Sequence, residues 1–237
     1  MGLSWVPGAK ADLNDGLVAW FTKSPSYDDR IIALSYASHR IFSGIGLWDK
    51  IAPEATPIKH IHISDQGQFG FTRLNNKDLG VPALGYVVSA RHLGQTLNEV
   101  LTPSPIDILA PAQLLQINQH DKMVDVQIML DKQVETLQTR LLVAADGGNS
   151  KVRQQLGIST RETDYGQTAV IANVTVEYPH KNIAYERFTP SGPLALLPLA
   201  DNDCSLVWTC ARSGVDEVMA LDDQTFLKAL QAKFGWR

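Results

Sequence analysis

The chain has 237 residues, of which 44% are hydrophobic and 19% are charged, a composition typical of a globular protein with a buried core. The net charge is −4 and both signs are interspersed, which argues against the clustered basic surface of a nucleic-acid-binding protein. Apolar runs such as Leu141 to Ala145 are too short to cross a bilayer, and no signal peptide is evident, so a cytoplasmic location is expected.

The first third of the chain mixes helical and strand patterns. Residues 1 to 27 are poorly patterned, with one short predicted helix from Leu13 to Phe21. From Ile31 to Trp48, apolar residues recur every three or four positions, which predicts a helix that Gly44 and Gly46 loosen or end. Its inner face would carry Leu34, Ala37, Ile41, Ile45 and Trp48. The pattern then predicts strands at Ile58–Ser64, Phe69–Leu74 and Tyr86–Ser89, and a helix from Leu93 to Leu101.

Two histidines lie in the first of these strands. Ile61 and Ile63 alternate with His60 and His62, which predicts a half-buried strand whose histidines share one face. Two histidines on one face could ligate a metal, but no third ligand is evident nearby. We therefore expect the histidines on the solvated face, and no metal site.

The middle of the chain predicts a β-meander that leads into a buried strand. Val124 to Leu130 alternates, Asp131-Lys132 supplies a turn, and Val134 to Thr139 returns. Leu141 to Ala145 is continuously apolar, the pattern of a strand buried on both faces. After it, Ser150 is a good N-cap for a helix with Val152 and Leu156 on its inner face.

The last third predicts mainly strands, at Ala169–Glu177, Ile183–Phe188, Leu194–Leu199 and Ser205–Cys210. A turn is predicted at Asp201 to Asp203. Asp222 can cap a final helix whose inner face is Phe226, Leu227, Leu230 and Phe234. Trp208 is expected in the core, and Cys204 and Cys210 are expected to be free buried thiols.

The segment from residue 141 to 153 carries the chemistry that the sequence predicts. A buried strand would end in the carboxylate of Asp146, and Gly147-Gly148 permits a tight turn and close approach by a ligand. The helix that follows would present free N–H groups to an anion, and Arg153 in its first turn can reach the same crevice. A plain strand–turn–helix unit without a ligand remains the alternative reading of the residues alone.

Three segments together resemble a known family. Residues 144 to 153, Ala-Ala-Asp-Gly-Gly-Asn-Ser-Lys-Val-Arg, resemble the Asp-Gly motif of FAD-dependent aromatic hydroxylases, the group typified by p-hydroxybenzoate hydroxylase. Residues 28 to 34 resemble the Asp-x-Arg-x-x-Ala-Leu segment of the same family. Residues 185 to 208, including Tyr-Glu-Arg-Phe-Thr and Gly-Pro-Leu-Ala-Leu-Leu-Pro-Leu, resemble the substrate-side sheet of the ubiquinone-pathway, 2-octaprenyl-6-methoxyphenol hydroxylase-like, subgroup.

This resemblance implies a mixed α/β (α+β) fold: a partial FAD-binding Rossmann-like layer and a β-sheet substrate domain of the p-hydroxybenzoate hydroxylase type. The implied division is residues 1–27 as an unmatched segment, 28–158 as an incomplete FAD-binding domain that includes the meander and the Asp-Gly motif, and 159–237 as the substrate domain with its final helix. It also implies an FAD- and NAD(P)H-dependent monooxygenase that hydroxylates a polyprenylated phenol. Expected partners are that phenol, an inner-membrane edge or a multi-enzyme ubiquinone-synthesis assembly, and other copies of the chain.

Carried over residue by residue, the resemblance assigns cofactor-binding roles to Asp146, Gly147, Ser150 and Arg153, with Arg30 near the flavin. Relatives often place Arg, Gln or Asn three residues before the position of Leu93, where this chain has Ala90, so Arg91 or Gln95 is the expected substitute. No catalytic residue is identified from the sequence.

The sequence departs from the family at two motifs. The Gly-x-Gly-x-x-Gly turn that meets the FAD pyrophosphate is not found, since Gly44-Ile45-Gly46 has no third glycine and follows a predicted helix. The C-terminal Gly-Asp motif is not found either. We therefore expect a fragment that binds FAD weakly or not at all, is inactive alone and self-associates. The alternatives are a non-catalytic remnant or interaction domain, or a related flavin oxidoreductase with another substrate.

Overall fold

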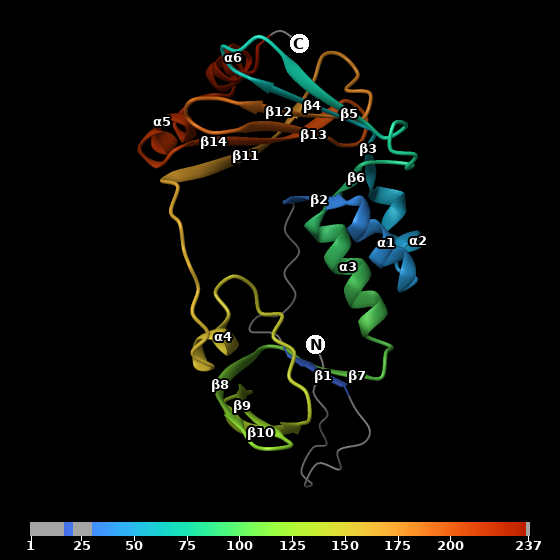
Figure 1. Cartoon of the computed structure of the whole chain (residues 1–237), viewed down its shortest axis with the longest axis vertical. Coiled ribbons are helices and arrows are strands. Elements are labelled where there is room, and N and C mark those ends of the chain that lie inside the picture. The colour runs from blue at the N-terminus through green and yellow to red at the C-terminus, as the bar shows by residue number, and fades with distance from the viewer. Residues whose placement is uncertain (1–16, 21–29, 236–237) are drawn as a thin grey trace. The chain divides into compact units, whose positions relative to one another are not determined.

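The computed structural model describes residues 17–20 and 30–235 (Figure 1). The chain forms two compact units, one of residues 1–27 and 94–162, the other of residues 28–93 and 163–237. The division at residues 27/28 and 158/159 stays a prediction. The helix predicted from Leu13 to Phe21 lies largely outside the described residues, and its described part is strand β1 (Leu17–Trp20).

The first unit contains two small sheets. Strand β1 pairs in parallel with β7 (Ile106–Leu109). The predicted meander is confirmed as an antiparallel sheet in the order β10-β9-β8, formed by β8 (Ala112–Gln119), β9 (Val124–Leu130) and β10 (Gln133–Thr139). Asp131 and Lys132 both adopt positive φ in the predicted turn. Val126, Ile128 and Leu137 are fully buried and cluster with Val152 of helix α4 (Lys151–Gln155).

The second unit is built on a six-stranded sheet in the order β11-β14-β13-β12-β4-β5. The strands are β4 (His60–Asp65), β5 (Phe71–Asn75), β11 (Gln167–Thr175), β12 (Ile183–Phe188), β13 (Leu194–Pro198) and β14 (Asp203–Ala211). Only the β12–β4 pair is parallel among these strand pairs. The strands predicted for this part of the chain are thus confirmed to within about two residues at their ends.

Helix α6 (Asp223–Phe234) covers one face of this sheet (Figure 1). Alternate residues of β14 turn toward it, so Leu206 and Trp208 cluster with Leu230. The predicted cap is confirmed, since the Asp222 side chain accepts a hydrogen bond from the Thr225 N–H at 2.8 Å. Helix α5 (Val215–Met219) precedes α6. Cys204 and Cys210 are free and buried, as predicted, and Trp208 is in the core.

The second unit also contains a three-stranded antiparallel sheet with helices. Its strand order is β2-β6-β3, formed by β2 (Ile31–Ser35), β3 (Thr56–Ile58) and β6 (Gly85–Ser89). The helical elements are α1 (Tyr36–Gly44), α2 (Trp48–Ile51), the 3₁₀ turn η1 (Ala52–Glu54) and the start of α3 (Ala90–Leu101), whose residues from 94 onward are part of the first unit. A short 3₁₀ turn η2 (Arg212–Gly214) follows β14. No helix among the described residues is long and apolar enough to span a membrane.

The helix predicted from Ile31 to Trp48 is wrong over its first five residues. Ile31 to Ser35 instead pairs with β6, because a β-branched apolar run can satisfy its backbone groups beside a neighbouring strand. Helix α1 begins only after Ser35, whose Oγ accepts a hydrogen bond from the Ser38 N–H at 3.1 Å. Ile41 and Ile45, predicted to face inward, are more than 60% exposed.

The buried strand predicted from Leu141 to Ala145 is also wrong. These residues have no strand assignment, and Leu141 and Val143 are 66% and 41% exposed. A strand buried on both faces needs a paired neighbour, and no described strand pairs with this run. The predicted inward positions of Leu156 and Leu227 are wrong too, since both side chains are exposed.

The prediction that the histidines of β4 lie on a solvated face is wrong for His62. His62 and Ser64 are buried, whereas Ile61 and Ile63 are only partly buried. The alternation of the residues defines two faces of the strand, but it does not say which of them a neighbouring element covers. His62 lies on the face toward Tyr185 and Phe71, with which its ring makes contacts.

Candidate functional site

The predicted corner after Leu141 to Ala145 is organised by two side chains that cap helix α4. The Ser150 Oγ accepts a hydrogen bond from the Arg153 N–H at 3.0 Å. The Asp146 Oδ2 accepts one from the Val152 N–H at 3.3 Å. Two N–H groups predicted to be free for an anion are therefore already bound by residues of the corner itself.

The carboxyl of Asp146 is held in its charged form. Partial burial raises its pKa, but the hydrogen bonds from the Ser150 side chain and from the backbone N–H of Val152 outweigh burial, and the net pKa is lowered. The corner thus carries a fixed negative charge. A negative charge repels a phosphate but accepts a hydrogen bond from a hydroxyl group. Because Asp146 already accepts hydrogen bonds within the corner, we interpret it as the residue that shapes the turn.

The two glycines leave open space above the backbone of the turn. Gly147 has a φ of +82°, which favours glycine, and a Cβ added at Gly147 or Gly148 would meet no atom within 4 Å. A flat or extended group could therefore lie against this backbone. On this observation the turn presents no steric obstacle to a dinucleotide.

Arg153 completes the corner but does not point freely outward. Its Nη2 donates a hydrogen bond to the Gly148 carbonyl at 2.6 Å, so the guanidinium folds back over the turn. The structure thus brings together the predicted residues Asp146, Gly147, Ser150 and Arg153. Of these, only Ser150 is buried.

The other predicted residues, Arg30, Arg91 and Gln95, belong to the region around helix α3. The Arg30 carbonyl accepts a hydrogen bond from the Ala90 N–H at 2.7 Å, which places Arg30 beside the start of that helix. Arg91 and Gln95 are four residues apart on α3, a spacing that puts them on one face, and both are exposed. Arg30 and Arg91 belong to the second unit, whereas Gln95 and the Asp146 corner belong to the first.

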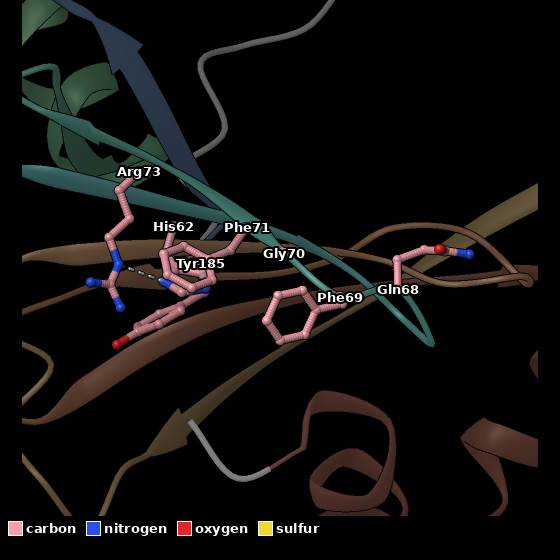
Figure 2. A pocket seen from close by; sticks show the side chains of 7 residues that line it. All are labelled: His62, Gln68, Phe69, Gly70, Phe71, Arg73 and Tyr185. Carbon is pink, nitrogen blue, oxygen red and sulfur yellow. Dashed lines mark hydrogen bonds between the residues drawn. The ribbon is translucent and has the colours of Figure 1, made fainter.

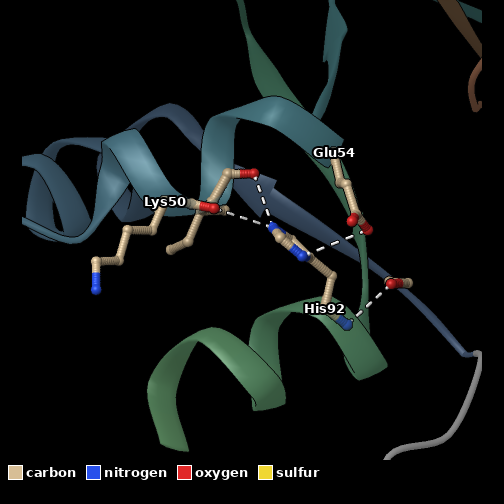
Figure 3. Close-up of polar contacts among 5 residues, drawn as sticks. Lys50, Glu54 and His92 are labelled. Atoms are coloured by element: carbon tan, nitrogen blue, oxygen red, sulfur yellow. Dashed lines mark hydrogen bonds and ion pairs between the residues drawn. The ribbon is translucent and has the colours of Figure 1, made fainter. Parts of the chain in front are cut away.

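The start of α3 is fixed by His92, the residue after Arg91 (Figure 3). The His92 Nε2 lies 3.2 Å from the carbonyl oxygens of both Lys50 and Ile51, at the end of α2. Its Nδ1 lies 3.3 Å from the Glu54 carboxylate. His92 therefore joins α3 to α2 and η1, and it positions the face that carries Arg91.

One polar cluster was not predicted from the sequence. His62, Arg73 and Tyr185 lie side by side on β4, β5 and β12, because the strand register sets His62 opposite both Arg73 and Tyr185. One local signal could have found part of this cluster. The residues on either side of the Gly67–Gly70 turn alternate, which predicts a hairpin that pairs His62 with Arg73. The partner strand from Tyr185 could not be inferred locally.

Comparison with known proteins identifies the family. Residues 22–236 match the model of the FAD binding domain family. The ubiquinone hydroxylase UbiL of Rhodospirillum rubrum is 36% identical over 210 residues, which are 88% of this chain and 48% of that protein. The 3-demethoxyubiquinol 3-hydroxylase of Escherichia coli is 32% identical over 190 residues, 79% of this chain and 48% of that protein. The chain spans about half the length of these curated relatives.

Solved structures support the fold. PqsL of Pseudomonas aeruginosa, described as a probable FAD-dependent monooxygenase, has a TM-score of 0.72 at 17% identity over 91% of this chain and 59% of that chain. The p-nitrophenol 4-monooxygenase PnpA of Pseudomonas putida has a TM-score of 0.69 at 15% identity over 92% and 55%. The predicted mixed α/β fold and the resemblance to FAD-dependent ubiquinone-pathway hydroxylases are confirmed. The chain belongs to the FAD binding domain family.

Proposed function

We propose that this chain is part of an FAD- and NAD(P)H-dependent monooxygenase that hydroxylates a polyprenylated phenol in ubiquinone biosynthesis. The observation that carries the proposal is the match of residues 22–236 to the FAD binding domain, joined to 36% identity with a ubiquinone hydroxylase over 88% of the chain. When bound, the flavin would supply the redox and oxygen chemistry, and the protein would bind and orient the reactants.

The Asp146 corner is the proposed contact with the cofactor. Gly147 and Gly148 would let the dinucleotide lie against the backbone, since nothing occupies the space above them. Asp146 and Ser150 would hold the turn through their bonds to the first turn of α4, with Arg153 bonded across it. Arg30, together with Arg91 or Gln95 on α3, is proposed to approach the flavin.

The proposed substrate surface is the face of the six-stranded sheet opposite α6. Ile171 and Leu74 lie on that face, because each alternates with residues that turn toward the α6 side, and they are 53% and 42% exposed. The middle of this face is covered, since Ala184 clusters with Val87 of β6 and with Ile58, so the exposed apolar side chains lie on the outer strands β11 and β5. Such side chains suit a prenyl chain, which gains free energy on leaving water. The same surface is the proposed origin of contacts with a membrane edge, with an enzyme assembly or with other copies of the chain.

We further propose that the 237-residue chain by itself binds FAD weakly. Leu141 and Val143, next to the corner, are exposed and unpaired in the described structure, so the turn is supported on one side only. Ligand affinity falls when the binding conformation is not held in advance.

The test is a titration of the purified chain with FAD, followed by flavin fluorescence, and then an assay with NADPH, oxygen and a short-chain prenylphenol. We expect saturable binding that is lost on gel filtration, and no hydroxylated product from the chain by itself. The absence of any saturable binding would overturn the cofactor assignment. Stoichiometric flavin retained through gel filtration would overturn the proposal of weak binding. A hydroxylated product from the purified chain with added FAD would overturn the expectation that the chain is inactive alone.

A further inference from the structure

Strand β11 forms one margin of the six-stranded sheet in the second unit, and β5 forms the opposite margin (Figure 1). β11 pairs with β14 in a continuous antiparallel register over all nine of its residues. The Arg212 N–H donates a hydrogen bond to the Gly166 carbonyl at 2.9 Å just before the strand, and the Val176 N–H bonds the Asn202 carbonyl just after it. Because every second residue bonds the partner in an antiparallel ladder, the even-numbered residues of β11 bond β14.

The odd-numbered residues of β11 therefore direct their backbone groups away from the sheet. These residues are Gln167, Ala169, Ile171, Asn173 and Thr175. In the described part of the chain, none of their backbone N–H or carbonyl groups has a hydrogen-bond partner. Their side chains are exposed too, on the sheet face opposite α6. Helix α5 contacts β11 on the other face, where its two inner valines belong to the cluster beneath α6.

β11 lacks the features by which proteins usually keep an edge strand from pairing. Such strands are short, bulged or covered, or they carry a charged residue or a proline. Residues 167–175 read Gln-Thr-Ala-Val-Ile-Ala-Asn-Val-Thr, with no charge, no proline and no glycine, and their register with β14 has no bulge. At nine residues the strand exceeds the usual length of about five or six. Its open margin can therefore accept a further strand.

The opposite margin of the same sheet is protected. Strand β5 has five residues, and its middle residue is Arg73. In Figure 2 the Arg73 side chain extends from β5 beside His62, to which its Nε donates a hydrogen bond at 3.4 Å. A second β5 strand, placed antiparallel and centred on this residue, would set two guanidinium groups opposite each other, and like charges in that position destabilise a strand pair.

We propose that β11 pairs with β11 of a second copy of this chain, antiparallel and centred on Ile171, so that the two six-stranded sheets become one. A two-fold axis at this residue sets Ile171 opposite its own copy and Ala169 opposite Asn173. It also sets Gln167 opposite Thr175. Each outward N–H then meets an outward carbonyl, because opposed residues of this kind exchange two hydrogen bonds.

The chemistry of β11 suits its own copy. The strand is nearly symmetric about Ile171, with small apolar neighbours on both sides and polar residues at both ends, and its lack of charge removes repulsion. Ile171 is 53% exposed and would pack against the same residue of the second copy, at about 5 Å between Cβ atoms. A two-fold contact uses both margins and closes at the dimer. The inference does not depend on the cofactor or substrate assignment, because it needs only the strand pairing of this sheet.

The first test is sedimentation velocity of the full chain without flavin or lipid. Strand pairing alone buries little area, so we expect a reversible dimer with a dissociation constant on the order of 10 µM. A chain that stays monomeric at about 200 µM would overturn the proposal. Polymers that grow without limit would also overturn it, because they need a head-to-tail contact instead of a two-fold one.

Hydrogen exchange on the unaltered chain locates the contact. Amides of the five outward residues should exchange roughly tenfold more slowly when the concentration is raised through the dimer transition. The control is the β5 margin, where Phe71 and Arg73 face outward because the Asn76 N–H bonds the Lys59 carbonyl. Exchange there should not change. Slowing that is equal at both margins, or absent at β11, would overturn the assignment.

A proline variant separates the strand margin from the exposed sheet face. Asn173→Pro removes one outward N–H without changing an apolar side chain, and proline is tolerated on an edge strand where its N–H faced solvent. We expect it to weaken the dimer roughly tenfold or more. Asn173→Ala is the matched control, since it keeps the N–H and should dimerise like the parent. Equal dimerisation of the two variants, both folded by circular dichroism, would overturn the proposal.

A charge exchange tests the register and decides the case if the proline variant does not fold. Ile171→Lys and Ile171→Glu each set like charges opposite each other in the dimer, so each variant alone should dimerise roughly tenfold more weakly than the parent. An equal mixture sets opposite charges together and should restore the dimer. Leu74→Lys on β5 alters the same sheet face at the other margin and should have no effect. A mixture that stays monomeric, or a loss as large in Leu74→Lys, would refute the two-fold pairing at Ile171.

Discussion

The Nδ1 of His92 lies 3.3 Å from the Oε2 of Glu54, so that a single imidazole connects the start of α3 to the turn that follows α2. The opposite nitrogen of the ring faces the carbonyls of Lys50 and Ile51, each at 3.2 Å. The His92 side chain is 14% exposed, compared with 64% for Glu54. If the ring is removed, water can therefore hydrogen-bond the exposed Glu54 carboxylate easily, but it reaches the carbonyls of Lys50 and Ile51 poorly.

Replacement of His92 is expected to destabilise the protein. His92→Ala leaves the carbonyls of Lys50 and Ile51 without this donor, and we expect the free energy of unfolding to fall by about 1–3 kcal/mol. Urea denaturation measures the change. His120→Ala is the matched control, because the His120–Asp125 pair is exposed and such pairs contribute about 0.5 kcal/mol. Equal losses in the two variants would refute a special role for His92.

Asp146 is expected to make the stability of the corner depend on pH. Its pKa is lowered in the folded chain from the ordinary value of 3.8, so its contribution is fully present above that value and is lost as pH falls through the folded pKa. Asp146→Asn removes the charged acceptor. The variant should be less stable than the parent at pH 6, and the difference should vanish in strongly acidic solution.

Amide hydrogen exchange at Val152 reports the loss of the Asp146 acceptor locally, because the Val152 N–H donates its hydrogen bond to Asp146. Faster exchange in Asp146→Asn is expected at pH 6. The corresponding variant Asp222→Asn at the cap of α6 is the control, since it should change exchange at Thr225 and leave Val152 unaffected. A difference in stability between the parent and Asp146→Asn that does not change with pH would contradict the prediction.

Gly85 is expected to tolerate no side chain. A Cβ at this position would lie 2.6 Å from the Leu34 carbonyl oxygen in the neighbouring strand β2. We expect Gly85→Ala to lower stability by about 1–3 kcal/mol, since the strands must move apart. Gly44→Ala in α1 is the control, because a Cβ there meets nothing within 4 Å and alanine favours helix by up to about 1 kcal/mol. Thermal unfolding distinguishes the two, and an unchanged midpoint for Gly85→Ala would rule the clash out.

Cys204 is expected to resist thiol reagents in the folded protein. Burial is the main cause that raises its pKa to about 11, and the adjacent Asp203 adds to the shift. At pH 8 the thiolate fraction is then about one in a thousand, and the thiolate is the reactive form. Labelling with a disulfide reagent should be slow until urea unfolds the chain. Rapid modification of Cys204 at pH 8 in a Cys210→Ser variant would argue against this environment.

Much of the fold could be predicted where local signals suffice. The turn at Asp131-Lys132 needs residues that tolerate positive φ, and the Asp222 cap needs a short acceptor before a helical pattern. Both are properties of a few adjacent residues. The helix boundary at Ser35 could have been found in the same way, since serine is a strong N-cap residue.

What could not be predicted depends on partners distant in sequence. Ile31 to Leu34 fits either a helix or a strand, and its pairing with β6 decides between them. Likewise, alternation in β4 defines two faces, but only Tyr185 and Phe234, more than 100 residues later, determine that His62 lies on the covered one. The composition of Leu141 to Ala145 likewise contains no information about whether a neighbour pairs with it.

The parallel pairing of β4 with β12 has a consequence for biosynthesis. His60 meets Ile183, so β4 leaves the ribosome more than a hundred residues before its partner exists. At typical elongation rates this delay is on the order of ten seconds. During that interval the edge of β4 that will pair with β12 is open, which makes the hairpin a target for chaperones and a hazard for aggregation. Slower synthesis should therefore lower the yield of native protein, unless a chaperone shields this hairpin.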